Sequence, residues 1–295
     1  LRISDEVTIM RDGTYIGTWP ASELTTDLII KRMVGREMTQ LFPEKTNTPG
    51  EEVLRAEGLT SILSNSFKNV SFSLRKGEIL GVGGLVGSRR TEVVEALFGL
   101  RHLQSGKIYL HGKEVKIKNP RDAKKYHMAL LTEERRTTGI FPMLNIVDNN
   151  TMASMMKYKN RVGLLNDLLR ETDTKQGITS LRIKTPGTDT RIQSLSGGNQ
   201  QKVLISRWLN TAPDILLLDE PTRGIDVGAK YEIYTIINRL ASEGKSVIMI
   251  SSEMSELLGM SDRIMVMSNG IMEGIIDAKE ATEEKIMELA TAGLM

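Results

Sequence analysis

The sequence contains no cysteine among its 295 residues, which excludes disulfide bonds and thiolate chemistry and is compatible with a reducing compartment. Aromatic residues make up only 4% of the chain, which disfavours a platform for stacking nucleic-acid bases. The formal net charge is +2, from 39 basic and 37 acidic residues, so no bulk electrostatic field attracts nucleic acid or an anionic membrane. We therefore expect no nucleic-acid partner.

Long apolar runs are also missing. No run approaches the roughly 20 residues that a membrane-spanning helix needs. The chain opens with LRISDEVTIMRDG, which has acidic residues and no apolar signal core. Its first residue is Leu1 rather than Met, so we expect a piece of a longer chain. The composition, 40% hydrophobic and 26% charged, is that of an ordinary globular protein with one large domain or two small ones.

The most informative stretch is residues 195–226, LSGGNQQKVLISRWLNTAPDILLLDEPTRGID. Its first feature is a glycine-rich turn that opens a predicted helix ending near Leu209. Such a turn exposes backbone N–H groups at the positive end of a helix dipole, which suits an anionic phosphate. Taken alone, the turn is equally compatible with a plain loop. Its residues are Ser196, Gly197, Gly198 and Asn199.

The second feature of this stretch is an apolar run, residues 215–218, that ends in Asp219 and Glu220. A buried strand followed by two acids places carboxylates at the edge of a sheet where open α/β folds bind ligands. One acid of such a pair can hold Mg²⁺ through water, and the other can orient an attacking water. Taken alone, the pair is also compatible with solvated acids at a strand end. A turn ending at Asp226 then leads into another predicted helix.

A candidate phosphate loop, GLVGSRRT, occupies residues 84–91 between a predicted apolar strand and a predicted helix. It is in frame with the pattern G-x-x-x-x-G-K-[ST] but departs from it twice, because Arg89 replaces the second glycine and Arg90 replaces the lysine. The planar fork of Arg90 can reach phosphate but does not replace a lysine ammonium conservatively. The alternative is a relic loop that binds little or no nucleotide. The candidate phosphate-binding residues are Gly84, Gly87, Ser88, Arg89, Arg90 and Thr91.

The opening segment is repeated near the far end of the chain. Ser4-Asp5 matches Ser261-Asp262, and Met10 matches Met267, without a gap between the matches. A constant offset over this length favours tandem duplication of a unit of about domain size, although chance similarity between two hairpin–helix segments is the alternative. We expect residues 1–41 to end a first unit, the polar residues 42–52 to form a linker, and residues 53–295 to form a second unit.

Together, LSGGNQQKV and DEPTRGID resemble the signature motif, Walker B motif and D-loop of ABC-type ATPases. With SSEMSELLGMSDRI, TEERRTTGI, YKNRVGLL and LRIKTPG, the chain resembles ATP-binding subunits of bacterial monosaccharide importers, in particular the galactose/methyl-galactoside branch. The resemblance implies an α/β fold, the ABC-type P-loop nucleotide-binding domain: a mostly parallel core sheet with helices, an antiparallel β subdomain, and a helical subdomain at about 141–198. It also implies that the chain is the C-terminal half of a protein with two such domains.

The resemblance further implies roles for individual residues, with ATP and Mg²⁺ as cofactors. Glu220 would be the catalytic base, and Asp226 would belong to the D-loop. Ser252 stands at the switch position, where the family usually has histidine, and Glu133 at the Q-loop position, where it usually has glutamine. The signature residues would contact ATP held by the other domain. The implied ligands of Mg²⁺ are Thr91, Asp219 and Glu133.

The implied partners are the N-terminal half, transmembrane permease subunits and, indirectly, a periplasmic or lipid-anchored sugar-binding protein, with the chain at the cytoplasmic face of the bacterial membrane. We expect slow turnover at this domain's own site, and the methionines and leucines of the 141–187 insert to form core. Phe67 is the only nearby candidate for adenine stacking. The alternative function is a nucleotide-sensing module that closes on ATP without hydrolysis, which Arg89, Arg90 and Ser252 favour and Glu220 disfavours.

Overall fold

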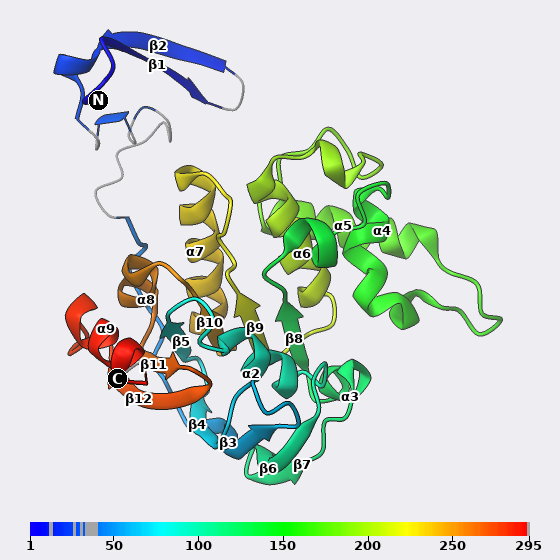
Figure 1. Cartoon of the computed structure of the whole chain (residues 1–295). Coiled ribbons are helices and arrows are strands. Elements are labelled where there is room, and N and C mark those ends of the chain that lie inside the picture. Colours follow the sequence, from blue (N-terminus) through cyan, green and yellow to red (C-terminus); the bar gives the residue numbers. More distant parts are fainter. Residues whose placement is uncertain (12–13, 26–27, 30–31, 33–40, 294–295) are drawn as a thin grey trace.

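The computed structural model describes residues 1–11, 14–25, 28–29, 32 and 41–293 (Figure 1). A six-stranded sheet with the order β12-β11-β5-β10-β9-β8 forms its centre. Strands β8, β9, β10, β5 and β11 run parallel, and β12 is antiparallel to β11. The strands are β5 (Ile79–Gly84), β8 (Met128–Leu131), β9 (Ile215–Asp219), β10 (Ser246–Ile250), β11 (Arg263–Ser268) and β12 (Ile271–Asp277).

The central strands are buried on both faces. Every residue of β9 (ILLLD) and β10 (SVIMI) is buried, which is the near-continuous apolar pattern of a parallel sheet covered on both sides. Alternate residues enter different cores: Leu217 packs in one with helix α2 (Arg90–Leu97), whereas Leu216 and Leu218 pack in the other with helices α6 (Gly197–Leu209) and α7 (Val227–Ser242). Packing on both faces of the sheet holds β9 in place and so fixes the position of its last residue, Asp219.

A second, antiparallel sheet has the order β4-β3-β6-β7. Its residues Leu54, Phe72 and Leu74 share one core with α2 and with β9, so α2 lies between the two sheets. Helix α3 (Pro120–Lys125) follows; Asn119 caps it by accepting hydrogen bonds from the N–H groups of its first turn, as the Asn-Pro pair predicts. The strands are β3 (Glu52–Ser61), β4 (Val70–Arg75), β6 (Leu103–Leu110) and β7 (Lys113–Val115).

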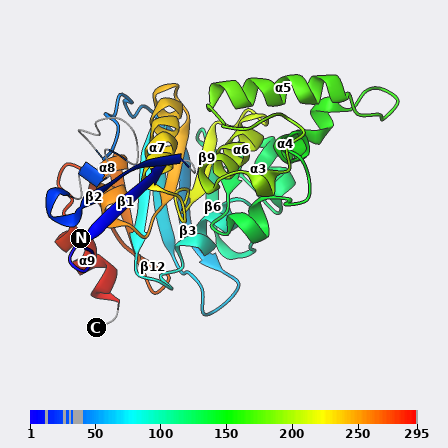
Figure 2. The same ribbon diagram turned by 90° about the horizontal axis from the view of Figure 1, so that it is seen from above.

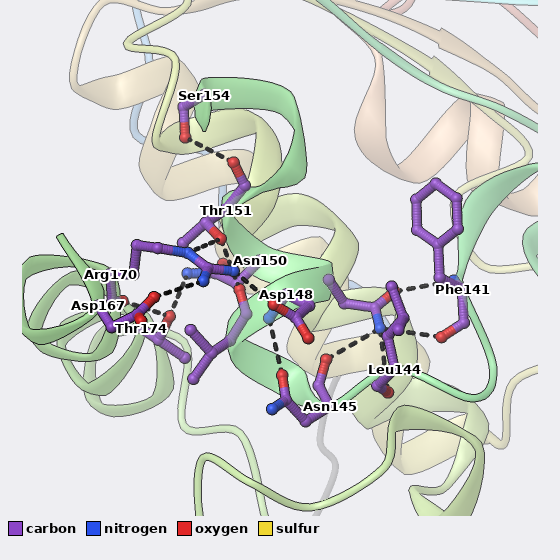
Figure 3. Close-up of polar contacts among 12 residues, drawn as sticks. Phe141, Leu144, Asn145, Asp148, Asn150, Thr151, Ser154, Asp167, Arg170 and Thr174 are labelled. Carbon is purple, nitrogen blue, oxygen red and sulfur yellow. Dashed lines mark hydrogen bonds and ion pairs between the residues drawn. The ribbon is translucent and has the colours of Figure 1, made fainter. Parts of the chain in front are cut away.

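A helical segment projects to one side of the central sheet (Figures 1 and 2). Figure 3 shows the polar contacts that join its helices: the buried Arg170 donates to the hydroxyl of Thr151 (3.1 Å) and to the carboxylates of Asp167 and Asp148. The elements are η2 (Arg135–Gly139), α4 (Ile146–Thr151), η3 (Met152–Tyr158), α5 (Asp167–Ser180), η4 (Ile192–Ser194) and α6. The predicted fold class, with a parallel core, an antiparallel sheet and a helical segment, is therefore confirmed.

One expectation for this segment is wrong. Its methionines and leucines were expected to be core, but Met156 and Leu168 have exposed fractions of 77% and 76%, and Met143, Val162 and Leu164 are also exposed. Met156 lies in the last turn of η3 and Leu168 in the first turn of α5, and both side chains face solvent. Leu181 is the exception among these methionines and leucines, because it packs in the core of the segment with Ile146 and Ile183.

The repeated sequence corresponds to two similar hairpins. Strands β1 (Glu6–Arg11) and β2 (Thr14–Pro20) match β11 and β12 residue for residue, and the pairing is irregular at equivalent places, between Ile9 and Met10 and between Val266 and Met267. The sequence match of Asp12-Gly13 to Asn269-Gly270 lies partly outside the described residues. The two hairpins therefore share strand bounds and an irregularity at equivalent positions. After β1 and β2 comes η1 (Ala21–Glu23), and after β11 and β12 comes α9 (Glu283–Ala292).

Of the expected linker, residues 42–52, the last residue begins β3, and residues 42–51 form an irregular strap that packs against the rest of the chain. The Phe42 ring lies 5.1 Å from that of Tyr234, centroid to centroid, and against Gly259 of helix α8 (Met254–Met260). Asn47 donates to the carbonyl of Gly77 (2.8 Å) and to the carboxylate of Asp262 (2.7 Å). The strap is thus bound to the domain by specific contacts. Among the described residues, no helix has the length and apolarity to cross a membrane.

Substituting Gly259→Ala should lower the free energy of unfolding by about 1–3 kcal/mol, because the added Cβ would lie 2.3 Å from the Phe42 ring. Urea denaturation measures the change. The control is Ser255→Ala, an exposed site on the same helix, with a change within about 0.5 kcal/mol. Equal stability of Gly259→Ala and the unsubstituted chain would contradict the packed position of the strap.

Candidate functional site

A cavity of about 430 Å³ opens at the carboxyl edge of the central sheet. Three of its walls come from the loop between β5 and α2, from the end of β9, and from the residues after β8 and β10. The structure thus brings together the two motifs that the sequence analysis singled out, the phosphate loop and the acid pair. The predicted residues that line the cavity are Gly87, Ser88, Arg89, Arg90, Thr91, Glu133, Asp219, Glu220 and Ser252.

The loop at residues 84–91 keeps the backbone shape that its glycine pattern predicts. Gly84 has φ +148°, and a Cβ there would lie 2.3 Å from the carbonyl oxygen of Met267. Gly87 has φ +84° and lies in open space. Arg89, which replaces the motif's second glycine, has φ 71°, a left-handed conformation that costs a side-chain-bearing residue roughly 1 kcal/mol. The chain therefore retains the turn although the glycine is gone.

The two arginines of the loop make different contacts. Arg89 pairs with Glu92 on the first turn of α2 (3.1 Å). Arg90 is buried and donates from Nη1 to the carbonyl oxygen of Ser251 (2.8 Å), at the end of β10. Burial lowers the pKa of Arg90, while the neighbouring Glu220 and Asp219 act to raise it. The guanidinium thus holds a fixed position between the acid pair and the neighbouring strand end.

The acid pair is nearly inaccessible to solvent. Asp219 is 2% exposed, and its Oδ1 is a buried oxygen without a hydrogen-bond partner within the described part of the chain. Burial raises the pKa of Asp219 to about 6; a hydrogen bond with Thr91 opposes this shift, and repulsion from Glu220 adds to it. An orphaned carboxylate oxygen beside a threonine hydroxyl is a donor set that fits Mg²⁺.

Glu220 is positioned by its neighbours on both sides. Burial raises its pKa, and Arg90 and the hydroxyl of Ser252 oppose that shift. Ser252 donates from Oγ to Glu220 Oε2 (3.2 Å), so the residue at the expected switch position contacts the expected base directly. Glu220 has φ 48°, a left-handed backbone that aims its side chain away from the line of β9 into the cavity.

Glu133, the expected Q-loop ligand of Mg²⁺, lines the cavity but is engaged elsewhere. Its carboxylate forms an ion pair with Arg223, which also lies 3.5 Å from Glu134. The ion pair engages Oε1 of Glu133 and leaves Oε2 as the oxygen that could face a cation. Arg223 was missed by the sequence analysis, although it stands inside the DEPTRGID motif.

The signature turn lies outside the cavity lining. Ser196 is exposed, and Asn199 donates to its hydroxyl (2.9 Å) at the start of α6. A Cβ on Gly198 would lie 2.4 Å from the Cβ of Ala229, so α6 and α7 meet at van der Waals distance only because this residue is glycine. Asp226 caps α7 by accepting from the Ala229 N–H (3.0 Å) and is itself exposed. Signature and D-loop residues therefore share one accessible surface beside the cavity.

Two further outcomes concern residues around these surfaces. The prediction that Phe67 stacks on adenine is wrong. Phe67 is 1% exposed and packs in the core between the two sheets, because the loop before β4 folds inward. Arg135, which sequence reasoning missed, donates to Gln200 (3.2 Å), and its Nη2 would lie 3.0 Å from a Cβ on Gly197. The sequence feature that could have identified Arg135 is its place in the TEERRTTGI motif.

Substituting Asp219→Asn should stabilise the chain against unfolding by about 2 kcal/mol at pH 8 in the absence of divalent cations. The folded-state pKa of about 6 lies above the unfolded value of 3.8, so the folded chain binds this proton more tightly than the unfolded chain does. The wild-type chain therefore loses stability as pH rises through 6, and the advantage of the amide disappears toward pH 4. Urea denaturation between pH 4 and 8 measures the difference in the free energy of unfolding between the variant and the wild-type chain.

The control for this measurement is Asp214→Asn, just before the first residue of β9, which loses only an exposed ion pair with Lys245. Its effect should stay within about 0.5 kcal/mol at pH 8. A pH-independent difference between Asp219→Asn and the wild-type chain would contradict the buried, ionisable position of Asp219.

Comparisons with known proteins agree with this geometry. Residues 67–223, just over half of the chain, match the family described as ABC transporter. The chain is 62% identical over 291 residues to the galactose/methyl galactoside import ATP-binding protein MglA of Clostridium tetani and 54% identical over 293 residues to that of Escherichia coli K12. In both cases the match covers 99% of this chain and 58% of the relative, so the chain spans less than two thirds of these relatives' length.

Solved structures resemble the same part of the fold. An ATP-binding cassette of an ABC transporter superposes with a TM-score of 0.69 and 20% identity, over 81% of this chain and 99% of that one. Another cassette, in a dimeric structure bound to ADP and phosphate, gives a TM-score of 0.65 and 20% identity, over 76% of this chain and 98% of that one. On the family match and the shared fold, this chain belongs to the ABC transporter family and has its ATP-binding cassette fold.

Proposed function

We propose that this chain binds and hydrolyses ATP as part of the energy-supplying subunit of a bacterial monosaccharide importer, with galactose or methyl galactoside as the carried sugar. The observation that carries the proposal is the cavity in which the loop at residues 84–91 faces the acid pair Asp219-Glu220, next to an exposed signature turn. The names of relatives that are 54–62% identical support the transported sugar.

In this proposal each cavity residue has a task. The N–H groups of the loop hold the phosphates of ATP, while Arg90 stays bonded to the carbonyl of Ser251. Thr91 and Asp219 would hold Mg²⁺, which when bound would offset charge on the phosphate oxygens. Glu220, with its pKa raised by burial, accepts a proton from the attacking water, and the Ser252 hydroxyl keeps that carboxylate in place. Glu133 would be within reach of the metal site as a further oxygen donor, since it lines the same cavity.

The signature turn serves a different nucleotide. Ser196 is exposed and Gly197 and Asn199 are half-buried at the N-terminus of α6, where with the buried Gly198 they would clasp ATP held by a second nucleotide-binding domain. The exposed Asp226 belongs to the same contact surface. The repeated hairpin, with its irregularity at equivalent residues, supports an N-terminal domain of the same protein as that partner.

Arg90 makes the two nucleotide sites unequal. Its guanidinium is bonded to the carbonyl of Ser251, whereas the lysine of the usual motif has a free ammonium for the phosphates. We therefore assign slow turnover to this chain's own site and most of the hydrolysis to the site completed by its signature turn. The further partners are membrane permease subunits and, through them, a sugar-binding protein, which places the protein peripherally on the cytoplasmic face of the cell membrane.

The second candidate function is nucleotide sensing without hydrolysis. The observation that favours it is the same contact of Arg90 with Ser251, together with serine at the switch position. Both proposals predict nucleotide binding, and only the first predicts phosphate release by the complete protein. Measuring the two quantities on the same sample distinguishes them.

Substituting Arg90→Lys should strengthen the binding of a fluorescent ATP analogue with Mg²⁺ by about three- to tenfold, because an ammonium freed from Ser251 can reach the phosphates. A fluorescence titration of the 295-residue chain measures the dissociation constant. Arg121→Lys, on the exposed side of α3, is the matched control and should leave it unchanged. Weaker binding by Arg90→Lys would show that the guanidinium itself is a phosphate ligand.

Substituting Ser196→Arg in a protein containing both nucleotide-binding domains should lower steady-state ATP hydrolysis by about 100-fold, because it blocks the donors that clasp the partner's nucleotide. Glu220→Gln should lower it by less than about threefold, since that site carries little of the turnover. A phosphate-release assay measures both, with the exposed Ser194→Arg as control. Complete loss of activity in Glu220→Gln would contradict the unequal division.

A further inference from the structure

A buried carboxylate lies directly beneath the acid pair. Glu256, in the first turn of α8, is 1% exposed. Its Oε1 accepts hydrogen bonds from the hydroxyls of Thr222 (2.6 Å) and Tyr234 (2.5 Å), and its Oε2 accepts one from Ser251 Oγ (2.7 Å). The ammonium of Lys230 approaches Oε1 to 3.2 Å. Four donors therefore converge on one side chain, two from α7 and one each from the residues after β9 and after β10.

These donors require an ionised acceptor. Burial acts to raise the pKa of Glu256, but the hydrogen bonds from Thr222, Tyr234 and Ser251 and the charge of Lys230 outweigh it, so the pKa lies below its ordinary value. A carboxylate offers acceptor sites on both oxygens and no hydrogen, which matches three hydroxyls and an ammonium. A glutamine would turn an NH₂ group toward one of these donors and leave Lys230 without its buried partner.

Glu256 thereby holds both sides of Glu220. Thr222 is two residues after Glu220, in the turn that leads to Asp226. Ser251 is one residue before Ser252, whose hydroxyl donates to Glu220. The carbonyl of Ser251 also accepts the hydrogen bond of Arg90. One carboxylate thus joins the residue that contacts Arg90 to the turn whose exposed end carries Asp226.

The hydrogen bonds to Glu256 stabilise the unfavourable backbone conformation of Glu220. Glu220 has φ 48°, and a side-chain-bearing residue keeps such a backbone only where its surroundings fix it. Anchoring Thr222 on one side and Ser251 on the other supplies that constraint. A displacement of Arg90 by a nucleotide would move Ser251, and through Glu256 it would also move Thr222.

We propose that Glu256 is a positioning residue that fixes Glu220 and transmits nucleotide binding at Arg90 to residues 222–226, the turn that faces the partner domain. The inference rests on the proposed function for its second part, since transmission needs nucleotide at this site. The first part, fixing the turn, concerns the chain without nucleotide.

Amide hydrogen exchange of residues 219–226 in the 295-residue chain tests both parts, measured with and without ATP and Mg²⁺. In the wild-type chain, ATP should slow exchange in this turn. In Glu256→Gln, exchange without nucleotide should be about tenfold faster there, because hydrogen bonds to a charged acceptor are lost. Fluorescent-ATP affinity should change by less than about threefold, and ATP should no longer slow exchange in the turn.

The matched control is Glu253→Gln, an exposed carboxylate that also pairs with Lys230 but accepts nothing from Thr222 or Tyr234 through its side chain. In Glu253→Gln, amide exchange of residues 219–226 should match that of the wild-type chain, both with and without ATP. If Glu256→Gln does not fold, Tyr234→Phe removes one donor and should shift exchange in the same direction by a smaller factor.

Two results would overturn the proposal: wild-type exchange of residues 219–226 in the Glu256 variant, or faster exchange spread evenly over the strands of the central sheet, which marks a general structural role. Persistence of the ATP effect in the variant would overturn the transmission part. Failure of the wild-type chain to bind ATP would contradict the proposed function instead, and the comparison without nucleotide would still decide whether Glu256 fixes the turn.

Discussion

The burial of two adjacent carboxylates beside one guanidinium is the interaction on which the site depends. Asp219 and Glu220 end a strand whose residues are all buried, so neither acid is solvated as it would be at a surface. Their pKa values are raised by that burial, and Arg90 is the cation that opposes the shift in both. An arrangement of this kind is poorly compensated without a ligand and favours the arrival of a divalent cation with an anionic substrate.

The rest of the domain keeps these groups in place. Apolar layers on both faces of β9 fix where the strand ends, and the antiparallel sheet presses α2 and its loop against that end. On the other side, α8 supplies Glu256 beneath the acid pair, and the strap at residues 42–51 packs on α8 through Phe42. The packing of Phe42 on α8 thus supports the helix that holds Glu256 next to the turn after β9.

Much of this could be predicted from the sequence. Continuous apolar runs followed by acids, and a glycine pattern between a strand and a helix, predict the carboxyl edge of a parallel sheet and its loop, because both depend on local chemistry. The meeting of residues 84–91 with Asp219 follows from the fact that parallel strands end at one edge. The motifs also identified the family, since their order is far more specific than any one of them.

Other features depend on contacts between distant residues and were not predictable. Nothing in the loop sequence reveals that Arg90 donates to Ser251 or that Arg223 pairs with Glu133. The exposed Met156 and the buried Phe67 have the same apolar character in the sequence, and only the packing of neighbouring elements separates them. Glu256 likewise has no local signal, because three of its four donors, Thr222, Lys230 and Tyr234, lie 22 to 34 residues away from it in the sequence.

The most direct test of the central claim is electron paramagnetic resonance of Mn²⁺, used in place of Mg²⁺, bound to the chain with ATP. The account predicts one ordered Mn²⁺ site whose signal shows coupling to the phosphorus nuclei of ATP and is lost in Asp219→Ala. A Mn²⁺ site that persists unchanged in Asp219→Ala, or that shows no coupling to phosphorus, would contradict the placement of metal and nucleotide between the acid pair and the loop at residues 84–91.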